Sequence, residues 1–214
     1  MPMKLAILFS GRIHRFQNHF TNIMESLVQE NDVDFFLSHS PELNEDLELF
    51  TELYNPRVLN NEPLELFNYM SYRCPDNEHR PTNILSMFYN RKRVFQDFKK
   101  HIQTTQEQYD LVISHRLDLY CYETLDLSLA KHGLCIPDTE SCGLFDQFAF
   151  GTLNTMEPYM TVYDHVESAL QSGCPFNAEI LLKTLLENTT IHRFPFKTQI
   201  IRDASCYIHK ESSL

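Results

Sequence analysis

The sequence predicts an α/β protein: a single three-layer domain with a central mixed, mostly parallel sheet flanked by helices. Short apolar runs typical of buried strands alternate with segments whose apolar residues recur at helical spacing. The alternation is regular early in the chain and becomes mixed later, where strand-like pieces follow one another. The 214 residues, 43% of them apolar, suffice for one domain with a full core. We take residues 1–214 as that domain, whether the chain is whole or one domain of a longer protein.

The first half of the chain predicts three strands and two helices. The apolar runs that predict the strands cover residues 4–9, 33–37 and 57–59. Apolar side chains at intervals of three and four predict a helix over residues 16–30, and an acidic helical stretch precedes the third strand. Residues 60–81 carry three prolines and no clear period, which predicts an irregular segment.

A long helix and a buried strand form the predicted centre of the chain. Thr82 is a suitable N-cap for a helix whose apolar positions extend to Ile102. A partly β-branched run at residues 111–113 predicts the strand that follows. Further strands are predicted at residues 133–136, 147–150, 191–196 and 199–202, and further helices at 156–171 and 177–187.

The composition argues against several functions. A net charge of −11 disfavours binding to nucleic acid or an anionic membrane, because such surfaces need clustered lysine and arginine. The one basic cluster, at residues 91–93 and 99–100, lies on the predicted long helix. Neither GxGxxG nor the GxxxxGK phosphate-loop motif occurs, so the common dinucleotide and nucleoside triphosphate folds have no support.

The cysteines and the first residues indicate the cellular setting. The six cysteines show no CxxC pair and no zinc-finger spacing, so we expect reduced thiols and no structural zinc. The apolar run at residues 4–9 is too short for a signal-peptide core or a membrane span. We therefore expect a cytoplasmic protein without membrane insertion.

The central strand leads into a polar segment suited to a ligand. Ser114, His115, Arg116 and Asp118 follow the apolar run at residues 111–113, at the kind of sheet edge where ligands bind. An aspartate there suits a divalent metal ion, and an arginine two residues earlier suits a phosphate group. The structural alternative is an ordinary surface ion pair between Arg116 and Asp118.

Two other strand ends carry polar residues. Ser10, Gly11 and Arg12 follow the first strand, where glycine tolerates a positive φ and Arg12 suits a diphosphate. Ser38 and His39 follow the second strand, and His39 is a candidate contact to a base or ribose. Turn chemistry explains each cluster alone equally well, and a structural histidine is the commoner case. The stronger argument is their convergence on one sheet edge.

Residues on the helices and in the second half complete the candidate site. Tyr89 and Arg93 share a helix face and are candidates to stack on and hydrogen-bond a ligand, although Tyr89 also suits the core. Asp146, Gln147 and Glu179 are candidates for catalysis, because a carboxylate near the reacting carbon of a sugar can act as a base or nucleophile. His209 is a candidate to complete a metal site with Asp118. The structural alternatives are a turn acceptor for Asp146 and a favourable helix-terminal charge for Glu179.

The order of these motifs resembles a known family. FSGR, FFLSHS, SMFYNRKRVF, YDLVISHRLDLY and FDQFAFG follow one another as in the nucleotide-sugar glycosyltransferases of GT-A type, in particular those that chlorella viruses encode and that are implicated in glycosylation of the major capsid protein. The resemblance covers residues 4–202.

The resemblance implies a UDP-sugar donor, a glycan or glycoprotein acceptor such as a viral capsid glycan, and Mn²⁺ or Mg²⁺ held by a DxD motif. The matching stretch here is Arg116-Leu117-Asp118, so only the last aspartate is kept, and Asp118 is carried over as the metal ligand. Gly11 and Arg12 are carried over to the nucleotide, and Asp146 and Gln147 to the transferred sugar. For a viral enzyme the expected location is the host cytoplasm.

Three alternatives remain. Asp32-Val33-Asp34 is a second DxD, but it opens a strand instead of ending one and we treat it as structural. A sugar-1-phosphate nucleotidyltransferase uses related chemistry, yet it needs a glycine-rich first loop that this chain lacks. A non-catalytic, transferase-like module that binds a glycan or a partner protein agrees with the incomplete motif.

Overall fold

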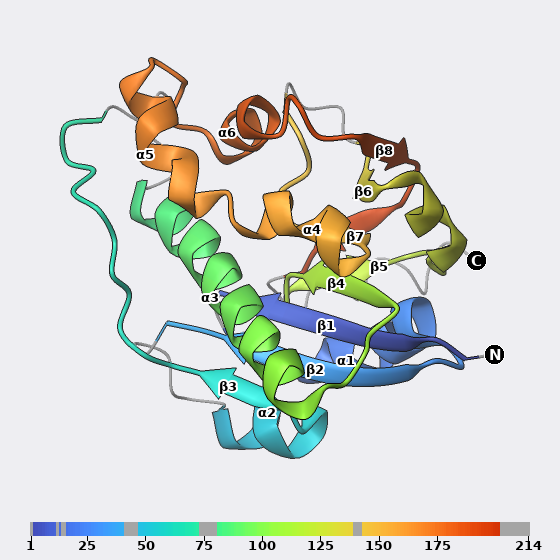
Figure 1. Ribbon diagram of the computed structural model, residues 1–214. Helices are drawn as coiled ribbons and strands as arrows, with labels where there is room; N and C mark the ends of the chain where they lie inside the picture. Colours follow the sequence, from blue (N-terminus) through green and yellow to red (C-terminus); the bar gives the residue numbers. More distant parts are fainter. Residues whose placement is uncertain are drawn as a thin grey trace, which may run out of the picture.

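A computed structural model describes residues 2–11, 13, 16–40, 47–72, 81–138 and 143–201 of the chain. Its centre is a seven-stranded sheet in the order β3-β2-β1-β4-β7-β6-β8 (Figure 1). The strands of this sheet are β1 Lys4–Ser10, β2 Asp32–Ser38, β3 Val58–Asn60, β4 Leu111–His115, β6 Leu134–Pro137, β7 Phe148–Gly151 and β8 Ile191–Phe194. A separate two-stranded ribbon pairs β5 (Leu119–Cys121) with β9 (Thr198–Ile200).

The strand directions make the sheet mixed and mostly parallel. β1 runs parallel to β2 and β4, and β2 runs parallel to β3. β7 runs antiparallel to β4 and β6, and β6 runs parallel to β8. The predicted fold class, an α/β fold with a mixed, mostly parallel sheet, is therefore confirmed. β1 to β4 end at the same edge at which β7 begins, and we call this the carboxyl edge.

Helices cover both faces of the sheet. They are α1 Gln17–Ile23, which continues into a π-helical turn at Met24–Val28, α2 Leu47–Tyr54, α3 Pro81–Thr105, a 3-10 helix at Leu127–His132, α4 Leu153–Met160, α5 Tyr163–Gln171 and α6 Ala178–Leu185. α3 to α6 pack on one face, and α1, α2 and the 3-10 helix pack on the other (Figure 1).

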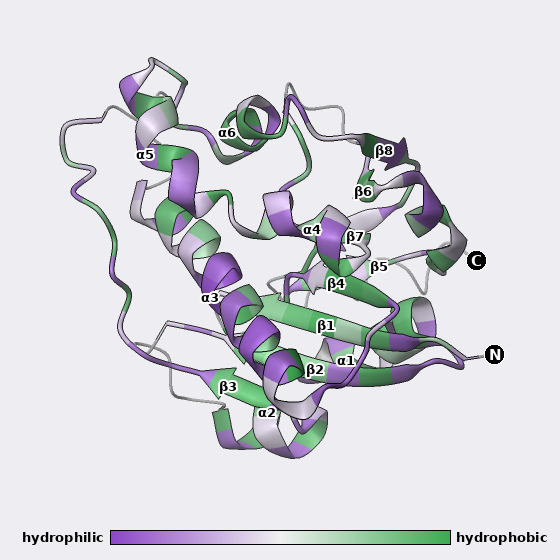
Figure 2. Cartoon of the chain, in the orientation of Figure 1, coloured by the Kyte–Doolittle hydropathy of each residue, from purple (hydrophilic) through white to green (hydrophobic). Residues whose placement is uncertain are grey.

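β1 shows why the sequence predicts a strand buried on both faces. Ala6 and Leu8 belong to the core under α3, whereas Leu5, Ile7 and Phe9 belong to the core under α1 and α2, and all five are fully buried. Because side chains alternate between faces, such a strand has an unbroken apolar sequence. Figure 2 shows these hydrophobic strands at the centre, beside the more hydrophilic outer surface of α3.

α3 differs from the prediction at its start, and it carries two buried arginines. It begins at Pro81, so Thr82 lies within the first turn and is not the N-cap; proline suits this turn because the N–H that it lacks has no helical acceptor there. Arg91 and Arg93 of the basic cluster are only 2% and 8% exposed. The two arginines of the cluster are therefore part of the protein interior.

The second half differs from the prediction in three places. The single helix predicted over residues 156–171 is two helices, α4 and α5, and Met160 and Val162 on either side of the break are both buried. Packing of both residues against the core favours a turn at this point, and the spacing of apolar residues in the sequence does not predict such a turn. The 3-10 helix and β5 were not predicted, and the predicted strand at residues 199–202 pairs with β5 outside the main sheet.

Candidate functional site

The carboxyl edge brings the predicted polar clusters side by side. Three backbone hydrogen bonds link neighbouring strand ends at this edge. The Gly11 N–H donates to the Ser38 carbonyl of β2 (3.0 Å), the His39 N–H to the Asn60 carbonyl of β3 (2.9 Å), and the Arg116 N–H, after β4, to the Gln147 carbonyl before β7 (3.2 Å). The predicted convergence therefore holds for the described residues of these clusters.

The turn after β1 has the conformation that its glycine predicts. Gly11 has a φ of 105°, and a Cβ added there would meet nothing within 4 Å. The position thus requires glycine for its backbone conformation and not for lack of space. Ser10 pairs with Ser38 in register and is half-buried. Arg12 lies outside the described residues, as does His209.

Arg93 supports the end of β2 from α3. Its Nε donates to Ser38 Oγ at 2.7 Å, and its Nη2 donates to the His39 carbonyl oxygen and to Asn90 Oδ1, both at 2.8 Å. Its Nη1 donates to the Glu62 carbonyl oxygen at 2.5 Å. A direct contact of Arg93 with a bound ligand stays a prediction. Its hydrogen bonds show that it joins three segments of the edge.

The other predicted residues near the end of β2 are packed inside the protein. Ser38 and His39 are fully buried, and His39 Nδ1 lies 2.9 Å from the Ser40 carbonyl oxygen. Burial, with a smaller effect of the Arg93 charge, lowers the pKa of His39, so the ring is neutral near pH 7. The Tyr89 ring lies 5.6 Å from the Arg93 guanidinium carbon, which confirms that the two share a helix face.

Arg116 and Asp118 form a forked ion pair at the end of β4. Arg116 Nε donates to Asp118 Oδ1, and Nη2 donates to Oδ2 at 3.0 Å. The Asp118 side chain is 12% exposed and the Arg116 side chain 33%. The predicted structural alternative, an ion pair, is therefore present, but it lies half-buried at the carboxyl edge and not on an open surface.

Asp146 lies beside Arg116, at the start of β7. It is 9% exposed, and burial raises its pKa. The charge of Arg91 acts in the opposite direction, the charge of Glu179 raises the pKa further, and that of Arg116 lowers it. The net effect is a pKa above the ordinary value for aspartate, which moves the group towards the range useful for proton transfer.

Arg91 is a residue of this site that the sequence did not predict. Its Nη2 donates to the Asp146 carbonyl oxygen, and its guanidinium carbon lies 4.2 Å from the Tyr159 ring centre and 5.3 Å from that of Phe88. Its buried Nε and Nη1 have no hydrogen-bond partner within the described part of the chain. The only sequence signal was its membership of the basic cluster on the predicted long helix.

Glu179 reaches the same site from α6. Asn177 caps this helix, with Oδ1 accepting from the N–H groups of Glu179 and Ile180 at 3.1 Å. The Leu144 N–H donates to the Glu179 carbonyl at 3.1 Å, and a Cβ on Gly143 would lie 2.3 Å from the Glu179 backbone. Gly143 therefore allows the segment before β7 to pack on the start of α6. Glu179 thus lies near Asp146 and also fits the predicted helix-terminal charge.

His115, predicted among the polar residues after the central strand, is instead the last residue of β4. It is 1% exposed, and its ring packs edge-on against Phe9 and Phe148, with ring centres 6.0 and 5.8 Å away. Burial, together with the nearby His19, lowers its pKa to about 3. His115 is therefore a neutral core residue.

The described side chains at the carboxyl edge do not fit the metal shell that the resemblance implies. Both Asp118 oxygens accept hydrogen bonds from Arg116. Among the residues that the structure describes, no three histidine, cysteine, aspartate or glutamate side chains are grouped to hold a metal ion.

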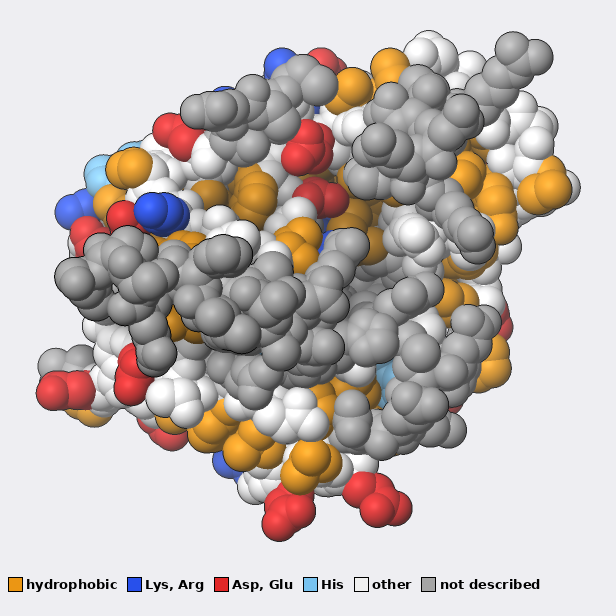
Figure 3. Space-filling view, turned by 180° about the vertical axis from the view of Figure 1, so that it is seen from behind, with side chains coloured by type: hydrophobic (Ala, Val, Ile, Leu, Met, Phe, Trp, Pro, Cys, Tyr) orange, Lys and Arg blue, Asp and Glu red, His pale blue; other side chains and the backbone are white. Residues whose placement is uncertain are grey.

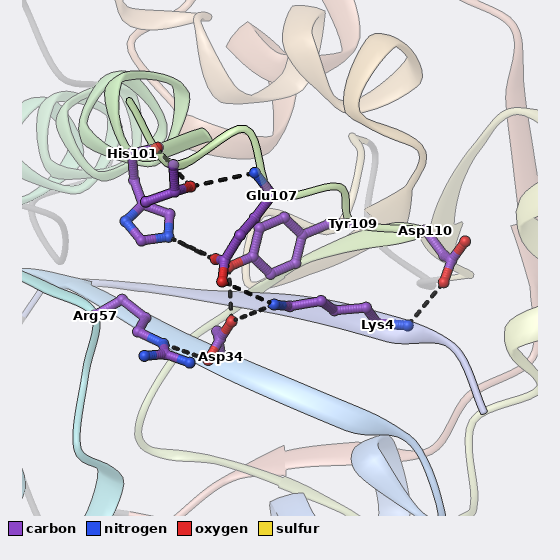
Figure 4. A network of polar contacts seen from close by, with 8 residues as sticks. Lys4, Asp34, Arg57, His101, Glu107, Tyr109 and Asp110 are labelled. Atoms are coloured by element: carbon purple, nitrogen blue, oxygen red, sulfur yellow. Dashed lines mark hydrogen bonds and ion pairs between the residues drawn. The ribbon is translucent and has the colours of Figure 1, made fainter. Parts of the chain in front are cut away.

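The second Asp-x-Asp motif belongs to a network at the opposite, amino edge of the sheet (Figure 4). Asp34 Oδ1 lies 2.6 Å from Arg57 Nε, and Asp34 Oδ2 lies 3.2 Å from Lys4 Nζ and 2.7 Å from the Tyr109 hydroxyl. Glu107 joins through Lys4, at 3.3 Å. These contacts agree with the structural role predicted for Asp32-Val33-Asp34.

Two cavities lie away from the candidate site. One of about 1030 Å³ is lined by residues 2–3, 29–31 and 124–128, and one of about 370 Å³ is lined by Glu123, Thr124, Asp126, Leu129 and residues 192–196. Neither lining includes a predicted site residue. The candidate site lies instead at the strand ends, where the topology of the sheet brings the charged side chains together.

The chain matches no protein-family model, and no curated protein matches its sequence. Within the described residues, no helix has the length and apolar composition needed to cross a membrane.

Proposed function

We propose that this chain is a glycosyltransferase that transfers a sugar from a UDP-sugar to a glycan or glycoprotein acceptor. The observation that carries the proposal is the convergence of Arg116, Asp118, Asp146 and Glu179 at the carboxyl edge of a mixed α/β sheet. Ligands of open α/β sheets bind at this edge. The order of the sequence motifs supplies the donor class.

The arrangement along the edge matches the parts of such a donor. The ends of β1 and β2, supported by Arg93, suit the nucleotide. Arg116 follows β4, which lies next to β1, and suits the diphosphate. Asp146 and Glu179, at β7 and α6, suit the sugar and its acceptor.

The transfer needs charge stabilisation and a proton acceptor. The bond from the anomeric carbon to a phosphate oxygen breaks, and its electron pair moves onto the departing diphosphate, where a cation stabilises it. An acceptor hydroxyl oxygen forms the new bond to the anomeric carbon, and its proton passes to a base. The raised pKa of Asp146 suits it to accept that proton.

Calorimetric titration of the chain with UDP, CDP and GDP tests the donor assignment. We expect UDP to bind at least about tenfold more tightly than the other two, a difference of about 1.4 kcal/mol. Release of UDP from a UDP-sugar would then establish transfer or hydrolysis. Equal binding of the three nucleotides would contradict the assignment, and glycan binding without nucleotide binding would favour the non-catalytic module.

A further inference from the structure

We infer that Arg116 takes the place of a divalent metal ion, so that this chain binds the diphosphate of its donor without one. The inference rests on the proposed function and specifies how the same site holds its substrate. It comes from the position of Arg116 among the carboxylates of the carboxyl edge.

Arg116 is a cation beside two carboxyl groups of the predicted site. It forms a fork with Asp118, and its charge also acts on Asp146. Asp118 is the side chain assigned by sequence to the metal, and Asp146 is the one assigned to the sugar. A positive charge beside both is what a divalent ion would supply, and here the chain supplies it.

The fork also opposes metal binding at Asp118. The negative charge of a carboxylate whose two oxygens accept hydrogen bonds from a guanidinium is already compensated. A divalent ion would have to displace the guanidinium and would be repelled by it at short range. Arginine cannot relieve this repulsion by losing its proton at physiological pH.

Arg116 retains the capacity to bind phosphate. A guanidinium carries five N–H donors, and the fork to Asp118 uses two of them. A third of the Arg116 side chain is exposed, whereas the Asp118 side chain is 12% exposed. The pair therefore presents an oriented cation, and the planar guanidinium matches the spacing of phosphate oxygens.

The test is calorimetric titration of the chain with UDP, in EDTA and in Mn²⁺. We expect the two dissociation constants to agree within about twofold. Arg116→Gln should weaken binding about tenfold to a hundredfold in both buffers, the range for charge-assisted hydrogen bonds. Arg57→Gln is the matched control: Arg57 also pairs with an aspartate, but at the amino edge, and its loss should leave UDP binding unchanged.

A second variant tests the exchange of cation for metal. Arg116→Asp places carboxylates two residues apart, as in the DxD motif, and should abolish UDP binding in EDTA while restoring it in Mn²⁺. Melting temperatures of both variants check that the fold is kept. UDP binding by the parent chain only with Mn²⁺, or metal-free binding that Arg116→Gln leaves unchanged, would overturn the inference and keep the proposed function. Absence of UDP binding in every buffer would overturn the proposed function itself.

Discussion

Asp146 is a carboxyl group that the fold holds out of water between charges of both signs. Burial raises its pKa more than Arg91 and Arg116 lower it, so the ionised form is disfavoured in the folded protein. When folding raises the pKa of a carboxyl group, the protein loses stability as pH rises through the interval between the unfolded and folded pKa values of that group. Asp146 therefore lowers the stability of the protein at neutral pH.

Asp146→Asn should separate stability from activity. We expect the variant to melt at the same temperature as the parent or higher near pH 7, because the amide carries no charge to bury. Its rate of UDP release from a UDP-sugar should fall by about a hundredfold or more, as expected for loss of a general base. The control is Asp138→Asn, whose side chain is 58% exposed and pairs with Arg193. Turnover within about twofold of the parent would remove Asp146 from the mechanism.

α3 carries two buried arginines that point to different parts of the carboxyl edge. Arg93 joins the helix to the end of β2 and to the segment after β3, whereas Arg91 binds the carbonyl oxygen of Asp146 at the start of β7. Because the two positions are two residues apart, their side chains leave different faces of the helix. One helix thereby holds both halves of the site in place.

Arg93→Met should be strongly destabilising. It removes at least four hydrogen bonds, including those to Ser38, His39 and Glu62, and leaves buried acceptors unpaired. We expect a loss of about 3 kcal/mol or more in the free energy of unfolding by urea. Lys92→Met is the matched control one residue away, where a partly exposed pair with Asp164 should cost less than about 1 kcal/mol. Equal losses in the two variants would contradict this role of Arg93.

The sequence predicts elements whose pattern is local and long. β1, β2, α1 and the body of α3 follow from unbroken apolar runs or from helical spacing, and the structure confirms them. β5 and the 3-10 helix have only three and six residues, too few to show a period. The break between α4 and α5 depends on packing against the sheet, which no local pattern records.

The site was predictable where it depends on strand ends. The clusters after β1, β2 and β4 are predictable from the sequence because parallel strands end at one edge. Arg91 was missed because a helical arginine is usually solvated, and its burial depends on the contact with β7. For Arg116 and Asp118 the sequence alone predicts an ordinary surface ion pair as the structural alternative, since the burial of the pair is set by neighbouring segments.

Two clusters of interacting polar side chains lie at opposite edges of the main sheet. The carboxyl edge holds the candidate site, and the amino edge holds the network of Asp34 and Glu107. On the face of Figure 3, carboxylate side chains are spread over the described surface and lysine and arginine are sparse, in keeping with the net charge of −11. Local cations such as Arg116 are therefore important for any anionic substrate.

Asp34→Asn tests this separation. Burial alone would raise the pKa of Asp34, but hydrogen bonds from Tyr109, Arg57 and Lys4 lower it below its ordinary value. Hydrogen bonds from His101 and Tyr109 lower the pKa of Glu107, in the same network, to about 2. Carboxyl groups with depressed folded pKa values stabilise the protein above their unfolded pKa values, and that stabilisation is lost as pH falls through the folded values.

The stability difference between the parent and Asp34→Asn should therefore be largest near neutral pH and should shrink as pH falls below the unfolded pKa of aspartate, about 4. Urea unfolding across this range measures it, and Asp32→Asn, at the exposed aspartate of the same motif, is the control that should leave the curve unchanged. UDP affinity should stay the same in both variants, because the network lies at the opposite edge from Arg116. A pH-independent stability difference would show that Asp34 contributes through packing and not through its charge. Loss of UDP binding in Asp34→Asn would place the ligand at the amino edge and would reverse the assignment of the two Asp-containing motifs.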